Sequence, residues 1–309
     1  MNFQLPVGEW VEALVRFILN HFQPGLDFIA DVVDGFGGAI NSALTAMPDW
    51  LIIGLFVGLA LWRVGLPFAL FTLASLLLIM SMSLWAAMVS TLGLVMAATA
   101  FSLVVGIPLG IMASRNATFE SVVKTMLDFM QTMPAFVYLI PAVMFFGLGR
   151  VPGIIATVIF AMPPAVRLTA LGIKQVPVEI VEAARAFGCT ERQLLLRVQL
   201  PTALPSIMAG VNQTIMLALS MIVIASMIGA GGLGNVVLQG IQRLDIGLGF
   251  KSGLSVVLLA IILDRLTQSF GRRSAPQRTW LSARLARLRP AQGRWSQQPV
   301  RPGIEGEAR

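Results

Sequence analysis

The feature that most constrains this chain is a series of long apolar stretches almost free of charged side chains. About 20 apolar residues are enough for a helix to cross the hydrocarbon core of a bilayer. Since only 12% of the 309 residues are charged and 56% are hydrophobic, the composition excludes a water-soluble globule. We therefore predict an all-α, polytopic membrane protein with about seven transmembrane helices. The predicted spans, of which the first and fourth are short, lie near residues 48–62, 65–82, 85–112, 134–149, 151–171, 206–230 and 250–268.

The first two spans allow an alternative. Arg63 lies between them, and a long basic side chain can extend from an apolar region to the membrane surface. The two stretches could therefore form one long, broken span.

Orientation follows from the positive charges, because cytoplasmic loops are enriched in Lys and Arg. If the polar segment 173–205 lies inside the cell, 18 of the 22 Lys and Arg residues lie inside as well. Only Arg16, Arg150, Arg243 and Lys251 then lie outside. We expect an external N-terminus and a cytoplasmic C-terminus. The net charge of +7 is on this interpretation a signal of topology, and we expect no nucleic-acid partner.

The polar segment 173–205 begins with a predicted short helix. Pro177 suits the first turn of a helix, where its missing N–H is not needed, and Gly188 suits the left-handed position just past the last turn. A helix from Val178 to Phe187 is therefore expected. Its small side chains, Ala183 and Ala184, would let a partner approach closely.

A second short helix is predicted to follow. Thr190 and Gln193 have the spacing of a capping box, which marks a helix N-terminus. We expect this helix to stop before Pro201, because a proline disfavours helical geometry in the residue ahead of it.

The residues of this segment also resemble a known family. Glu182-Ala183-Ala184 is followed after three residues by Gly188, and after nine more by Val198-Gln199-Leu200-Pro201. This spacing resembles the signature loop of ABC importer permeases, whose pattern usually has Ile where Val198 stands. In that family the loop is the cytoplasmic coupling helix, which docks in a groove of the ATP-hydrolysing subunit. An ordinary cytoplasmic helical hairpin is the alternative. The resemblance implies a type I ABC importer permease fold, with ATPase coupling at Glu182, Ala183, Ala184, Gly188, Leu200 and Pro201.

Two kinds of residue pattern are missing from the sequence, and both concern the source of energy for transport. Proton-coupled carriers need titratable groups within the membrane, yet no Asp or Glu lies between Asp49 and Glu120 or between Asp128 and Glu179. The chain also has no Gly-Lys dipeptide, which the phosphate-binding Walker loop requires. We expect a transport subunit that is no enzyme and binds no cofactor, with ATP and Mg held by a partner ATPase. The alternatives are a secondary carrier and an osmolyte channel, both of which work without an ATPase.

Further segments are similar to the glycine betaine and proline betaine branch of these permeases. The resemblance implies a homodimer in the bacterial inner membrane, cytoplasmic ATPase subunits and a periplasmic substrate-binding protein. It also implies uptake of glycine betaine, proline betaine or related quaternary ammonium osmolytes. Aromatic faces usually bind such cations, yet the chain has six Trp and one Tyr and shows no obvious aromatic cage, so we expect selectivity to reside mainly in the binding protein. The matching segments are residues 131–141, 172–177, 209–214, 225–229 and 262–268.

Candidates for the translocation pathway are the uncharged polar residues of the sixth span, Asn212, Gln213 and Ser220. Polar groups in hydrocarbon usually face the interior of the helix bundle. Hydrogen bonding between helices is the alternative role for these side chains.

Three regions are expected along the chain. Residues 1–49 form an external tail with a possible amphipathic helix, residues 50–270 form the permease domain, and residues 271–309 form a basic cytoplasmic tail. Basic and apolar residues alternate in the last region, which is typical of a helix lying on anionic lipid, although a tail that only fixes the topology is equally compatible.

We infer no catalytic or binding function from two further patterns in the chain. Gly229, Gly231 and Gly234 have the spacing of the dinucleotide-binding fingerprint, but that motif requires a βαβ unit. We expect a tight turn there. Cys189 is the single cysteine, so neither an intrachain disulfide nor a cysteine metal cluster is expected.

Overall fold

The computed structural model describes residues 7–271, and every regular element in this range is a helix. The predicted all-α class is therefore confirmed. In chain order the helices are α1 (Val7–Ala46), α2 (Asp49–Arg63), α3 (Leu66–Ser81), α4 (Trp85–Arg115), α5 (Ala117–Thr132), α6 (Ala135–Phe146), α7 (Arg150–Lys174), α8 (Val178–Ala186), α9 (Glu191–Gln193), η1 (Leu194–Gln199), α10 (Leu200–Ala225), η2 (Ser226–Ile228), α11 (Gly232–Gln242) and α12 (Ile246–Gly271).

All seven predicted spans coincide with helices, but their lengths differ. Four helices are long and apolar enough to cross a membrane: α4, α7, α12 and the continuous helix Glu191–Ile228 that contains α10. The pairs α1–α2 and α5–α6 are apolar enough together, but they bend by 99° and 100°. By length and composition the described residues thus offer four spans, or up to six if each bent pair is one span. The first and fourth predicted spans are short helices, of 15 and 12 residues, as expected.

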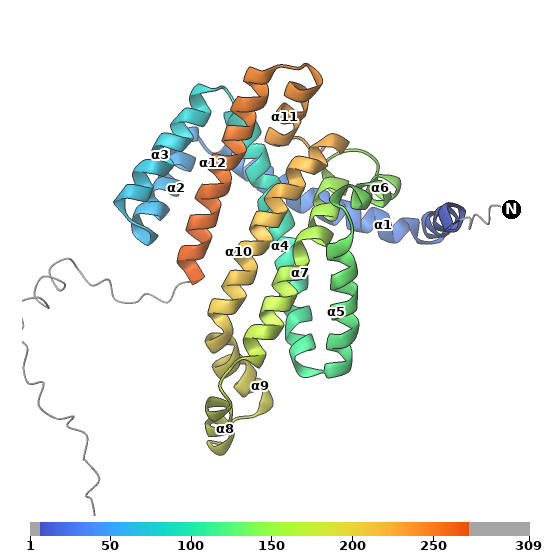
Figure 1. The fold of residues 1–309 in the computed structure, drawn as a ribbon, viewed down its shortest axis with the longest axis vertical. Helices are drawn as coiled ribbons and strands as arrows, with labels where there is room; N and C mark the ends of the chain where they lie inside the picture. The colour runs from blue at the N-terminus through green and yellow to red at the C-terminus, as the bar shows by residue number, and fades with distance from the viewer. Residues whose placement is uncertain (1–6, 272–309) are drawn as a thin grey trace, which may run out of the picture. The chain divides into compact units, whose positions relative to one another are not determined.

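Helices α2 and α3 lie side by side and form a hairpin (Figure 1). Gly65 joins them with a φ of 125°, which a residue with a side chain rarely adopts. The two stretches are therefore not one long span. Arg63 donates to the carbonyl of Ser269 at 3.2 Å, and its guanidinium lies 4.4 Å from the ring centre of Phe270. It thus holds the end of α2 against the end of α12.

Glycines bring the central helices into close contact. Helix α7 packs against both α4 and α10. A Cβ on Gly110 of α4 would lie 2.6 Å from the carbonyl oxygen of Val166, and one on Gly210 of α10 would lie 3.1 Å from that of Pro164. In lipid, where apolar burial does not drive helices together, small residues allow the close packing that does. These three helices form the frame that carries the polar segment 173–205.

The N-terminal region, where an amphipathic helix is expected, forms a helix of 40 residues. Its C-terminal half packs against the frame, where Val33 is buried and Asp34 forms an ion pair with Arg150 at 2.7 Å. Towards its N-terminus large side chains such as Trp10 and Phe17 are exposed. The basic tail predicted after residue 271 lies outside the described residues.

Candidate coupling site

The first helix predicted in the polar segment is α8, which ends at Ala186, within one residue of the expected end. The N–H of Cys189 donates to the carbonyl of Ala184 at 3.1 Å, and that of Gly188 donates to Arg185 at 2.9 Å. These two bonds make a Schellman motif, which requires a left-handed residue after the helix. Gly188 supplies it with a φ of 77°. The predicted role of Gly188 is confirmed.

The capping box that starts the second helix is also confirmed. The N–H of Gln193 donates to the Thr190 hydroxyl at 3.4 Å, and the N–H of Thr190 donates to the Gln193 side chain at 2.9 Å. Each side chain thereby satisfies a backbone donor that has no partner within the helix.

The predicted stop before Pro201 is wrong. Helix α9 runs through the π-helical turn η1 straight into α10, so that Glu191–Ile228 is one continuous helix. The N–H of Leu200 donates to the carbonyl of Leu195, five residues back, as in a π turn. Such a wider turn relieves the clash that a proline ring makes with the carbonyl four residues back, and Pro201 has no N–H to leave unpaired. Leu200 and Pro201 therefore connect the loop rigidly to α10.

The loop presents its side chains to the outside of the chain. Helix α8 buries no residue, Glu182 and Ala183 are exposed, and Ala184 is half-buried. Phe187 is 90% exposed and Val178 63%. Helix α8 lies at one end of the α7–α10 pair (Figure 1). Because apolar surface gains free energy when it leaves water, this tip suits docking on a protein partner.

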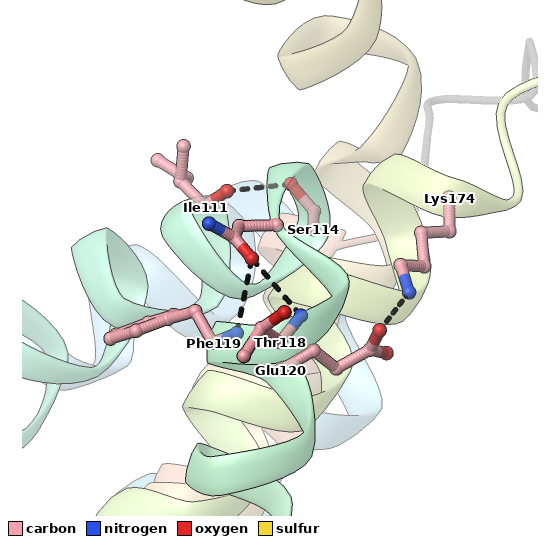
Figure 2. A network of polar contacts seen from close by, with 7 residues as sticks. Ile111, Ser114, Thr118, Phe119, Glu120 and Lys174 are labelled. Carbon is pink, nitrogen blue, oxygen red and sulfur yellow. Dashed lines mark hydrogen bonds and ion pairs between the residues drawn. The ribbon is translucent and has the colours of Figure 1, made fainter.

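The loop is bound at two points to the turn between α4 and α5. Arg115 donates to the backbone carbonyl of Glu191 at 3.1 Å. Lys174, the last residue of α7, forms an ion pair with Glu120 in the first turn of α5 (Figure 2). Sequence reasoning missed these contacts, because their partners lie 76 and 54 residues apart and no local pattern links them.

The three candidate pathway residues have different surroundings. The Asn212 amide donates to the carboxylate of Asp264 on α12 at 2.9 Å, and Gln268 donates to the same carboxylate at 2.8 Å. Asn212 thus takes part in hydrogen bonding between helices. Gln213 and Ser220 are exposed in the single chain, and the Ser220 hydroxyl donates to the carbonyl of Met216 at 3.1 Å.

The glycine-rich segment forms a turn between α10 and α11, as expected. Gly229 and Gly231 have φ values of 88° and 90°, and a Cβ on Gly234 would lie 2.8 Å from the Cα of Val223. The neighbouring Leu233 donates its N–H to the hydroxyl of Thr91 at 2.7 Å. These glycines serve backbone conformation and close packing.

Comparison with known proteins decides the family. Residues 106–276, more than half of the chain, match the family described as "Binding-protein-dependent transport system inner membrane component". The chain belongs to this family. It is accordingly a permease subunit, a multi-pass component of an inner-membrane transporter, in agreement with the prediction from the Glu-Ala-Ala loop.

Three relatives of this permease carry glycine betaine in their names. It is 48% identical over 279 residues to the glycine betaine/proline betaine permease ProW of Escherichia coli, covering 89% of this chain and 78% of the relative. It is 50% identical to the glycine betaine/carnitine permease GbuB of Listeria monocytogenes, covering 87% and 97%. Identity to the glycine betaine permease OpuAB of Bacillus subtilis is 47%, covering 86% and 94%. The predicted branch of the family is confirmed.

The fold also matches solved structures. An inward-facing structure of the methionine ABC transporter MetNI aligns with a TM-score of 0.54 at 24% identity, covering 60% of this chain and 94% of the matched chain. The predicted type I ABC importer permease fold is confirmed.

Proposed function

We propose that this permease imports glycine betaine, proline betaine or a related quaternary ammonium osmolyte, driven by a separate ATPase and supplied by a periplasmic binding protein. The observation that carries the proposal is the identity of 47% to 50%, over 86% to 89% of the chain, to three permeases named for glycine betaine. ATP and Mg bind to the partner ATPase, and this chain binds no cofactor.

The loop from residue 173 to 205 is the site at which the ATPase acts. Its exposed tip supports this assignment, since α8 buries no residue and Phe187, directly after it, is 90% exposed. Helix α8 contacts η1, and η1 continues into α10 without a break at Pro201, so a displacement of α8 is passed through η1 to a membrane-spanning helix. Two copies of the permease then alternate between inward-facing and outward-facing states.

The distribution of charge supports the orientation. The loop and the C-terminal tail face the cytoplasm, and the N-terminal region faces the periplasm, which places most Lys and Arg residues inside. Gln213 and Ser220, exposed on the apolar helix α10, supply polar groups for a path between the two copies. Asn212, which is bound to Asp264, holds α10 against α12.

Reconstitution into proteoliposomes tests the proposal. The permease with its ATPase, binding protein and enclosed ATP should accumulate radiolabelled glycine betaine against a gradient, and the permease alone should not. Accumulation by the permease alone would show a secondary carrier, and passive flux would show a channel. A binding protein that binds no betaine would refute the substrate class.

A further inference from the structure

The turn between α4 and α5 is held by local hydrogen bonds. The side-chain oxygen of Asn116 accepts the N–H groups of Thr118 at 3.0 Å and Phe119 at 3.1 Å, and the Ser114 hydroxyl donates to the Ile111 carbonyl at 2.7 Å (Figure 2). A capping side chain fixes the first turn of the helix that it precedes. A displacement of this turn therefore moves the start of α5 with it.

The coupling loop is attached to this turn at two points. Lys174, where the chain leaves α7, pairs with Glu120, and Arg115 binds the backbone of Glu191, where α9 begins. The Glu191 carboxylate also accepts a hydrogen bond from Arg185 of α8 at 3.1 Å. Polar contacts thus connect both α8, through Glu191, and the end of α7, through Lys174, to the α4–α5 turn.

Charged contacts link helix α5 to α7. Helix α5 buries only Leu127, so apolar packing holds it weakly. Two turns beyond Glu120, Asp128 pairs with Arg167 of α7 at 2.6 Å. Both these charged side chains and apolar ones such as Leu127 and Val166 line a cavity of about 290 Å³ between the two helices. The two ion pairs thus bridge α5 and α7 beside this cavity.

The far end of α5 leads to the 100° bend before α6. The Tyr138 hydroxyl of α6 donates across the bend to the carbonyl of Met130 in α5. Helix α6 is itself anchored, because Tyr138, Leu139 and Ala142 are buried. Helix α5 thus connects the coupling loop to the bend before α6, and the hydrogen bond from Tyr138 stabilises that bend.

On the basis of the proposed function, we propose that α5 moves with the coupling loop and passes the displacement made by the ATPase to the bend before α6. Glu120 and Lys174 are positioning residues in this transmission: their ion pair makes the start of α5 follow the end of α7. This second route runs beside the direct one through α10.

Charge reversal in the complete reconstituted transporter tests this transmission. Glu120→Lys and Lys174→Glu should each lower betaine uptake per ATP hydrolysed by about fivefold, the upper end of what an exposed ion pair contributes. In Glu120→Lys, whose residue lies in α5 outside the loop 173–205, the amount of ATPase bound and the basal ATP hydrolysis should stay unchanged. The double variant, which restores the pair in reverse, should recover most of the uptake.

A matched control is Asp34→Lys, which reverses one charge of the ion pair between α1 and α7, away from the loop. It should leave the ratio of uptake to hydrolysis unchanged. An equal loss in this variant, no recovery in the double variant, or a parallel loss of ATPase binding in Glu120→Lys would overturn the transmission role. If the unmodified transporter shows no ATP-driven uptake, the proposed function fails and this inference fails with it. If the unmodified transporter shows ATP-driven uptake and the variants match it, the inference alone fails.

Discussion

Gly188 offers the sharpest test of the coupling loop, because its role is a matter of backbone conformation alone. Its φ of 77° places it in the left-handed region, and a Cβ built at this position meets nothing within 4 Å. A substitution there changes conformational energy without changing packing within the chain. The effect should therefore follow each residue's tolerance of the left-handed conformation, and side-chain size should not matter.

The magnitudes follow from the geometry. An alanine held in the left-handed region costs about 1–2 kcal/mol, which lowers the population of the native turn by a factor of about 5–30. Asparagine visits this region readily, so Gly188→Asn should cost less. Gly188→Pro cannot form the turn, since proline holds φ near −65° and lacks the N–H that donates to Arg185 at 2.9 Å.

Uptake by the reconstituted transporter, normalised to the amount of permease inserted, measures the effect. Uptake should fall in the order glycine, asparagine, alanine, proline, with insertion into the membrane unchanged throughout. Unimpaired uptake by Gly188→Pro would contradict the assignment of the loop. An asparagine variant as inactive as the proline variant would show that side-chain size, rather than backbone conformation, governs the site.

Two stability predictions concern the frame, and thermal unfolding of the purified permease in detergent checks both. Thr91→Val removes the acceptor of the buried Leu233 N–H and should cost about 1–3 kcal/mol, whereas Thr91→Ser should keep the bond and lower the Tm less. Gly110→Val places a Cβ 2.6 Å from the carbonyl oxygen of Val166 and should cost at least about 1–3 kcal/mol by forcing α4 away from α7. Gly54→Val, where nothing lies within 4 Å, is its control, and equal Tm values for these two valine variants would refute the packing argument.

Local chemistry was sufficient to predict much of the loop. The end of α8, the left-handed Gly188 and the capping box of Thr190 and Gln193 each depend on residues no more than five positions apart. The membrane class depends only on the length and charge of apolar stretches. These features could be predicted from the sequence because the groups that determine them are neighbours along the chain.

Tertiary structure alone decided whether Pro201 ends a helix, which partner Asn212 binds and what Glu120 contacts. A local rule stops the helix before Pro201, yet the π turn carries it into a membrane-spanning helix packed against α7. The partners of Asn212 and Glu120 lie 52 and 54 residues away along the chain. A sequence shows which donors and acceptors exist, but the packing of helices selects which of them meet, because one helix face can be paired with many others until the whole bundle is assembled.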